Sequence, residues 1–215
     1  AKENLLAEDV PDKQIIVTGN TVIDALLSIV DKARLVSFSS GLLNSLPFLT
    51  VESLRCIVLV TGHRRENFGG GFEEICQALR DLACMHPEVL IVYPVHLNPN
   101  VQEPVIRILS KVSNINLIEP LDYLPFVKLM DISFLILTDS GGVQEEAPSL
   151  GKPVLVLRDN TERPEAIEAG TVKLVGANRE KIVDAVSNLF ADEIAYKKMA
   201  RAHNPYGDGR ASKRI

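Results

Sequence analysis

The chain has 215 residues, of which 46% are hydrophobic and 24% are charged, and its 23 basic and 28 acidic side chains give a net charge of −5. This length and hydrophobicity allow a substantial buried core, which excludes an intrinsically disordered protein. The acidic balance argues against nucleic acid as the main partner. No apolar run approaches the roughly 18 residues of a membrane span. The amino end has no secretory signal pattern, so we expect a cytoplasmic protein without a membrane partner.

The amino-terminal part of the sequence differs from the rest. Ile15–Thr18 predicts a strand, Thr21–Val30 a helix, and Ser37–Thr50 a connection that contains Ser, Gly, Leu and Pro. A first strand with no βα unit before it can pair only with a later sheet. We therefore interpret residues 1–54 as the tail of an amino-terminal domain with its linker, residues 55–215 as the main domain, and the chain as a fragment.

The main domain alternates short β-branched runs with helical patterns, which predicts an α/β fold with a Rossmann-like, doubly wound parallel sheet. The expected strands are Cys56–Val60, Val89–Tyr93, Ile115–Ile118, Phe134–Leu137, Val154–Leu157 and Val172–Val175. The expected helices are Phe72–Ala83, Tyr123–Met130, Val143–Leu150, Pro164–Ala169 and Arg179–Phe190, with Gly151 and Gly170 as stops. Ligands bind such sheets beyond the carboxyl ends of the strands.

The three cysteines, Cys56, Cys76 and Cys84, have no Cys-x-x-Cys spacing and lie in apolar runs. This pattern predicts reduced thiols in the core. We expect neither a metal site nor a bound cofactor.

A serine and two glycines follow the fourth expected strand and precede a helix. Glycine lets the backbone approach a ligand, a helix amino terminus attracts anions, and Ser140 adds a hydroxyl, so Ser140, Gly141 and Gly142 predict a phosphate site. Glu146 lies one to two helical turns further on, which is about the reach from a diphosphate to its ribose. We expect the replacement of Glu145 to weaken ligand binding less than the replacement of Glu146. The alternative is a capped helix start after a buried strand.

Polar residues also follow the first strand. His63, two arginines, a glutamate and Gly69–Gly71 suit an anionic ligand and a group that handles protons, and the three glycines permit a mobile loop. The alternative is a solvated polar loop. His96 follows the second strand on the same edge, where it can contact the ligand or serve as a structural hydrogen-bonding residue.

Two further candidates stay ambiguous from the residues alone. Arg163 precedes a helix opened by Pro164, with Thr161 or Asn160 as a cap, and it can reach a phosphate or a sugar hydroxyl. It can equally be a surface arginine paired with a neighbouring glutamate. Phe126 can stack on a base or fill the core.

Five strings now point to a family. TGHRRENF, YPVHLNPNV, DSGGVQEEAPSLGKPVLVLRD, TERPEA and NPYGDG closely resemble the carboxyl-terminal half of bacterial non-hydrolysing UDP-N-acetylglucosamine 2-epimerase. Several strings in one order are far more specific than a lone glycine-rich turn. The resemblance implies a B-type glycosyltransferase architecture, in which this chain is the second of two lobes around a UDP-sugar, and a homodimer at full length. By the same resemblance the chain stops short of the last helix of the family.

The resemblance also implies residue roles. His63 faces the diphosphate and the reacting sugar as the catalytic residue, and Ser140, Gly141 and Gly142 hold phosphate oxygens. Glu146 accepts from the ribose, Phe126 contacts uracil, and Arg163 lines the sugar-phosphate region. In some family members a second substrate molecule acts as an allosteric activator, and the positions that match its contacts are Arg64, Glu66 and His96.

The implied reaction is reversible C2 epimerisation of UDP-N-acetylglucosamine to UDP-N-acetylmannosamine, through elimination and re-addition of UDP. The proton-transfer carboxylates of the family belong to the amino-terminal lobe, so we expect the fragment to be inactive on its own. Three alternatives remain: a UDP-sugar glycosyltransferase lobe, a non-catalytic nucleotide-binding or dimerisation module, and a hydrolysing epimerase.

Overall fold

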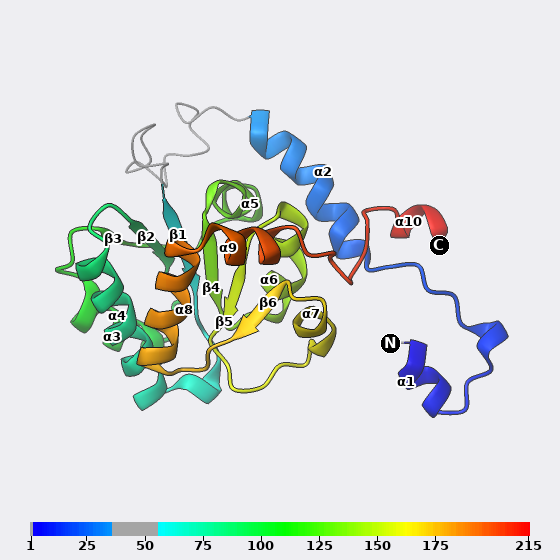
Figure 1. Cartoon of the computed structure of the whole chain (residues 1–215), viewed down its shortest axis with the longest axis horizontal. Coiled ribbons are helices and arrows are strands. Elements are labelled where there is room, and N and C mark those ends of the chain that lie inside the picture. Colours follow the sequence, from blue (N-terminus) through cyan, green and yellow to red (C-terminus); the bar gives the residue numbers. More distant parts are fainter. Residues whose placement is uncertain (1, 36–55) are drawn as a thin grey trace.

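The computed structural model describes residues 2–35 and 56–215. The predicted connection Ser37–Thr50 and the predicted domain boundary after residue 54 lie outside the described residues. The expected fold class is confirmed, because the main domain contains a six-stranded parallel sheet with helices on both faces (Figure 1).

The strand order places a topological switch point in the middle of the sheet. The strands are β1 (Ile57–Thr61), β2 (Leu90–Pro94), β3 (Ile115–Ile118), β4 (Leu135–Thr138), β5 (Val154–Val156) and β6 (Val172–Leu174). They are arranged in the order β3-β2-β1-β4-β5-β6, and every pairing is parallel. The chain winds outward from β1 in one direction and from β4 in the other. In doubly wound sheets the crevice at this reversal is the usual ligand site.

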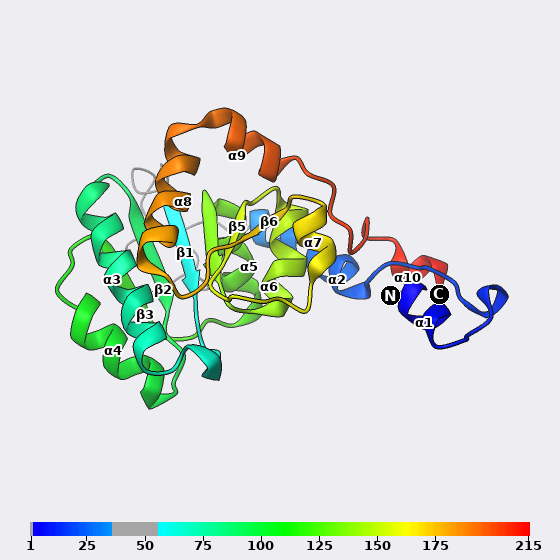
Figure 2. The same ribbon diagram turned by 60° about the horizontal axis from the view of Figure 1, so that its bottom comes forward.

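Helices cover the two faces of the sheet in two groups (Figures 1 and 2). The first group is α3 (Gly70–Met85), α4 (Pro99–Leu109) and α8 (Arg179–Ala191), followed by α9 (Glu193–Ala200). The second group is α2 (Thr21–Leu35), α5 (Tyr123–Ile132) and α6 (Gly141–Glu146). Two hydrophobic clusters result, and β1 contributes Val58 and Val60 to one and Ile57 and Leu59 to the other. This alternation follows from the two-residue period of a strand.

Shortening a side chain in the second cluster should destabilise the whole domain. Leu59 is fully buried in the central strand, so Leu59→Ala removes apolar contacts and leaves a cavity. We expect the free energy of unfolding to fall by about 2–5 kcal/mol in urea titrations. The matched control is Leu97→Ala at a residue that is 66% exposed, for which a change within about 0.5 kcal/mol is expected. Equal losses for the two variants would contradict this assignment of the core.

All six predicted main-domain strands are present, with ends that differ from the predicted ones by at most one residue. The predicted helix Val143–Leu150 divides into α6, which begins earlier at Gly141, and a 3₁₀ turn, η5 (Ala147–Leu150). The predicted stops are confirmed, because Gly151 and Gly170 have φ angles of +68° and +76° after η5 and after α7 (Pro164–Glu168). These left-handed angles favour glycine.

Three predictions about strands, cysteines and glycines are wrong. Ile15–Thr18 is not a strand, since no strand of the described sheet pairs with it, and Ile16 and Val17 are 80% and 70% exposed. Cys84 is exposed, because its position near the end of α3 points away from the buried stripe that contains Cys76. Gly69–Gly71 is not a loop, because Gly69 caps α3 and the other two glycines start that helix.

The two terminal segments lie together at one side of the sheet (Figures 1 and 2). They carry α1 (Lys2–Ala7), η1 (Asp12–Gln14) and α10 (Ala211–Arg214). The carboxylate of Asp24 on α2 accepts from the backbone N–H groups of Ala211 and Ser212, which fixes the start of α10. No helix among residues 2–35 and 56–215 is long and apolar enough to cross a membrane.

Candidate functional site

The candidate site begins where β1 and β4 end side by side. Thr61 and Thr138 are register partners, and their hydroxyl oxygens are 2.6 Å apart. The polar segments that follow these strands therefore start from adjacent points at the switch point of the sheet. This geometry brings the segment with His63 next to the segment with Ser140.

Asp139 connects the two segments. Its side chain is fully buried, and Oδ2 accepts hydrogen bonds from the backbone N–H groups of His63 (2.9 Å) and Arg64 (2.8 Å). The other oxygen, Oδ1, lies 3.2 Å from Nδ1 of His63. A buried carboxylate is costly unless such donors compensate it. Asp139 therefore fixes the turn after β1 against the end of β4.

His63 shares a cavity of about 240 Å³ with two other predicted residues. His96 and Phe126 line this cavity together with His63, and the rings of His63 and His96 stack at a centroid distance of 5.6 Å. Nδ1 of His96 accepts from the backbone N–H of Asn98 at 3.1 Å. Two imidazoles and a phenyl ring thus form one open apolar and aromatic surface.

A buried tyrosine supports the segment before His63. The hydroxyl of Tyr93, on β2, donates to the carbonyl oxygen of Gly62 at 3.2 Å. Burial raises the pKa of Tyr93 well above its ordinary value, so the hydroxyl stays protonated and remains a donor. This bond ties the turn after β1 to β2 as well as to β4.

The Ser140–Gly142 turn is approached by two arginines. Ser140 precedes α6 and makes no side-chain cap bond, and its backbone N–H donates to the hydroxyl of Thr138 at 2.9 Å. A Cβ added to Gly141 would lie 3.2 Å from Oε1 of Glu162, 3.8 Å from Nη2 of Arg163 and 3.9 Å from Nη2 of Arg64. The two guanidinium groups and the Glu162 carboxylate that pairs with Arg64 therefore gather at the start of α6, where a helix has N–H groups without intrahelical partners.

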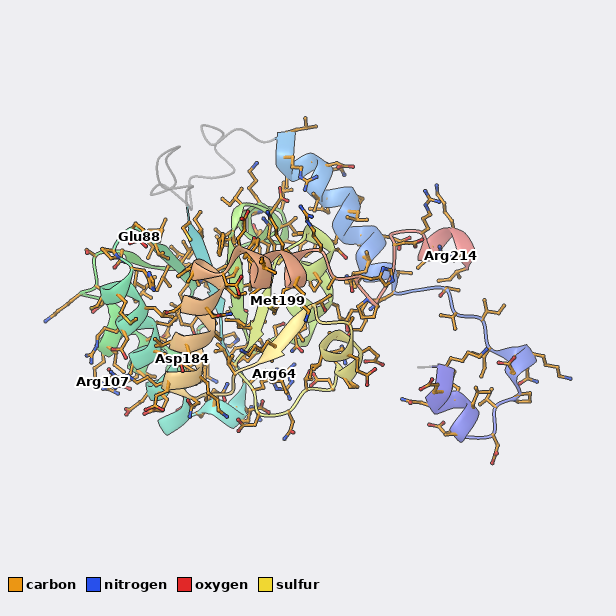
Figure 3. The ribbon with its side chains drawn as sticks, in the orientation of Figure 1. Arg64, Glu88, Arg107, Asp184, Met199 and Arg214 are labelled. Atoms are coloured by element: carbon orange, nitrogen blue, oxygen red, sulfur yellow. The ribbon has the colours of Figure 1, made fainter. Side chains whose placement is uncertain are left out.

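Arg64 lies in this group although the resemblance placed it only at a second substrate molecule. Figure 3 shows its side chain at the lower edge of the molecule beside α7, and Nη2 is 3.7 Å from Oε1 of Glu162. Its Nε atom is buried and has no hydrogen-bond acceptor among the described residues. Arg158 bridges Glu162 and Glu66, so the predicted residues Arg64 and Glu66 belong to one chain of ion pairs.

The carboxylate of Glu145 orients Arg163. Nε of Arg163 donates to Oε1 of Glu145, and Oε2 of Glu145 accepts from the side-chain amide of Asn20 at 2.7 Å. The predicted cap of α7, Thr161 or Asn160, is wrong, because the residue at the cap position is Arg163. The hydroxyl of Thr161 instead accepts from the backbone N–H of Arg163 at 3.0 Å. Glu145 was expected to matter less than Glu146, and its contact gives it a positioning role.

Glu146 and Phe126 are connected through α5. Oε1 of Glu146 accepts from the hydroxyl of Tyr123 at 2.8 Å, and Phe126 lies one turn further along the same helix. Burial raises the pKa of Glu146, an effect that the bond from Tyr123 opposes.

This shift predicts how stability depends on pH. Because the folded-state pKa of Glu146 is raised, the carboxylate costs stability once the pH exceeds that pKa. We expect Glu146→Gln to be more stable than the wild type at pH of about 7, and the difference to disappear below the ordinary glutamate pKa of 4.5. Urea unfolding at a series of pH values measures this. A variant that is less stable than the wild type at neutral pH would contradict the prediction.

The comparisons with known proteins agree on one family. A sequence profile described as UDP-N-acetylglucosamine 2-epimerase matches residues 1–215. The chain belongs to the UDP-N-acetylglucosamine 2-epimerase family. The curated UDP-N-acetylglucosamine 2-epimerases of Yersinia pestis and Escherichia coli K12 are 62% and 59% identical to it over 216 residues. Each match covers 100% of this chain and 57% of the relative, so the chain spans little more than half of their length.

Solved structures of the epimerase family have the same fold. One of them is the UDP-N-acetylglucosamine 2-epimerase of Neisseria meningitidis, crystallised with UDP-GlcNAc. It superposes with a TM-score of 0.92 at 51% identity, and the match covers 100% of this chain and 57% of the Neisseria chain. The carboxyl-terminal domain of a Francisella tularensis glycosyl transferase superposes with a TM-score of 0.55 at 16% identity, over 70% of this chain and 82% of that one. This second likeness concerns the fold alone.

The structure brings most of the predicted residues of this epimerase-family chain together. His63, Arg64, Gly141 and Arg163 lie around the carboxyl ends of β1 and β4, and His96 and Phe126 share the cavity beside them. Sequence reasoning gave no role to Asp139. The available signal was a charged residue directly between a buried strand and the Ser-Gly-Gly turn, since such a charge needs partners.

Proposed function

We propose that this chain supplies the UDP-binding half of an enzyme that reversibly interconverts UDP-N-acetylglucosamine and UDP-N-acetylmannosamine. The observation that carries the proposal is the approach of Arg64 and Arg163 to Gly141, next to His63, at the switch point of the sheet. Guanidinium groups and helix N–H groups are the donors that bind diphosphates. The relative from Neisseria meningitidis, crystallised with UDP-GlcNAc, supports the choice of nucleotide sugar.

The diphosphate would lie over the Ser140–Gly142 turn. Three features support this placement: the hydroxyl of Ser140 makes no cap bond, Nε of Arg64 lacks an acceptor among the described residues, and the guanidinium of Arg163 is held by Glu145. These donors are positioned before any ligand arrives, so little reorganisation is needed on binding.

The nucleoside would extend from the diphosphate toward α5. Glu146 is the proposed acceptor for the ribose hydroxyls, and the ring of Phe126 is the proposed contact for uracil. The bond from Tyr123 uses only Oε1 of Glu146, which leaves the second carboxylate oxygen for the ribose. The one-turn spacing of Tyr123 and Phe126 on α5 supports a single site for both parts of the nucleoside.

The proposed epimerisation at C2 begins with the departure of UDP. The C2 proton is not adjacent to a carbonyl group, so direct removal is difficult. Breaking the C1–O bond sends its electron pair to the diphosphate and leaves an oxocarbenium-like centre that acidifies C2. Loss of the C2 proton to a base then gives a glycal. Proton delivery to the opposite face and return of the UDP oxygen to C1 complete the inversion.

The residues of this chain would act on the leaving group. Donors at the Ser140–Gly142 turn, together with His63 and Arg163, would stabilise the charge that develops on UDP. Removing one such donor typically raises a barrier by about 3 kcal/mol. The base and acid at C2 would come from the part of the protein that this chain does not include, as the family resemblance implies. The second substrate molecule at Arg64, Glu66 and His96, and the full-length homodimer, remain predictions.

Calorimetric titration of UDP into the 215-residue chain tests the proposal. We expect saturable binding by the wild type and a loss of about 10- to 100-fold in affinity for Glu146→Ala, since bonds to a charged acceptor contribute about 1.5–3 kcal/mol. The control is Glu88→Ala, because Glu88 lies at the edge of the sheet opposite to Arg64 (Figure 3). Absence of binding by the wild type would contradict the proposed function. Equal affinity of the wild type and Glu146→Ala would remove the ribose assignment.

A further inference from the structure

A buried carboxylate oxygen lies beside the ring of the proposed catalytic histidine. Asp139 is fully buried, and its Oδ2 is already used by two backbone N–H groups. Its Oδ1 is buried and has no hydrogen-bond partner among the described residues. The nearest positive or polar side chain that the structure pairs with it is His63, whose Nδ1 lies 3.2 Å away.

The position of Asp139 limits how this oxygen can be satisfied. The backbone bonds to His63 and Arg64 hold Oδ2 in place, and Asp139 itself is held by a backbone bond from its N–H to the carbonyl oxygen of Thr61 at 3.1 Å. The carboxyl group therefore cannot turn away without losing two charge-assisted bonds. Nδ1 of His63 is 3.2 Å from Oδ1, but the two atoms are not aligned as a hydrogen bond. A rotation of the imidazole ring would bring an N–H on Nδ1 onto this oxygen.

We propose that Asp139 is a positioning residue that selects the Nδ1–H tautomer of His63 and holds its ring in the cavity that His63 shares with His96 and Phe126. With the proton on Nδ1, the neutral ring keeps its free lone pair on Nε2. His63 then faces the site with a nitrogen that accepts a proton or, once protonated, donates to a phosphate oxygen. The expected effect on UDP binding rests on the proposed function, whereas the assignment of the tautomer does not. The tautomer is a property of the free chain.

The substitution Asp139→Asn tests the assignment with little change in shape. The single amide oxygen would continue to accept from the two backbone N–H groups, and the amide NH₂ group would replace Oδ1. An NH₂ group donates and does not accept, so Nδ1 of His63 would become the acceptor and the proton would move to Nε2. In the serine protease triad the corresponding Asp-to-Asn change traps the wrong histidine tautomer.

The experiment uses the ¹⁵N-labelled 215-residue chain in long-range ¹H–¹⁵N spectra of its histidine rings, at a pH of about 8.5, where a histidine ring is ordinarily neutral. His63→Gln assigns the signal. We expect the Nδ1–H form in the wild type and the Nε2–H form in Asp139→Asn. The control Glu162→Gln removes a carboxylate that pairs with Arg64 and should leave the His63 tautomer unchanged. Thermal unfolding verifies that each variant is folded.

A parallel UDP titration connects the tautomer to binding. We expect Asp139→Asn to lose about tenfold in UDP affinity, the size expected for one bond to a charged group. An unchanged tautomer in a folded Asp139→Asn chain, or an unchanged UDP affinity, would overturn the inference. Failure of the wild type to bind UDP would instead contradict the proposed function, because the tautomer is measured without ligand.

Discussion

The 215-residue chain is expected to bind UDP and to produce no measurable epimer from UDP-N-acetylglucosamine. The groups proposed here act on the leaving UDP, whereas proton transfer at C2 needs an acid and a base that we assign to the remaining part of the protein. General acid–base catalysis alone contributes about 10²–10⁴-fold. Because both transfers at C2 would be lost, we expect turnover at least about 10⁴-fold below that of a full-length relative.

Proton NMR of the sugar anomeric signals measures this turnover directly, with the 62% identical Yersinia pestis protein as the complete enzyme. In D₂O the same spectra report exchange of the C2 proton. Activity within about tenfold of the complete enzyme, a difference of about 1.4 kcal/mol in the barrier, would show that the proton-transfer groups lie in this chain. Release of free N-acetylmannosamine and UDP by the complete enzyme would identify a hydrolysing reaction.

Replacing Arg163 should weaken UDP binding strongly. The guanidinium of Arg163 is half-buried, is oriented by Glu145 and lies near Gly141, so its bond to a phosphate would be charge-assisted and already positioned. Arg163→Met keeps most of the side-chain volume and removes the charge. We expect UDP affinity to fall by about 10- to 100-fold in calorimetry.

The matched control is Arg107→Met. Arg107 lies on α4 at the left edge of the molecule, away from Arg64 (Figure 3), and it pairs with Glu73 and Glu103. Its removal changes the net charge equally and should leave UDP affinity within about twofold. If both variants lost affinity to the same extent, a long-range effect of charge would explain the result and the assignment of Arg163 would fail.

The strands β1, β4 and β5 were predictable because they are buried on both faces of a parallel sheet, which requires a continuous apolar run such as Val58–Val60. Ile15–Thr18 was predicted as a strand and is not one. It has a similar β-branched composition, but a strand exists only where a neighbour completes its hydrogen bonds. The prediction that Cys84 lies in the core fails for a related reason. An apolar run does not indicate which side of α3 each residue occupies at the end of the helix.

The site was partly predictable for the same reason that the strands were. Ser140, Gly141 and His63 follow buried strands directly, and the carboxyl ends of parallel strands share one edge. The partners of Arg163 and Glu146 were not predictable. Glu145 and Tyr123 are ordinary helix residues in the sequence, and only the packing of α6 against its neighbours gives them these contacts.

The sequence by itself determined the parallel α/β sheet, the family, and the residue types at the strand ends, because these depend on local hydrophobic periodicity and on motifs in one short stretch each. The tertiary structure alone decided that Asp139 holds His63 and that Arg64 joins Arg163 at Gly141. Asp139 and His63 are 76 positions apart. Their contact depends on β1 and β4 being neighbours in the sheet, and strand order is not encoded in the pattern of either strand.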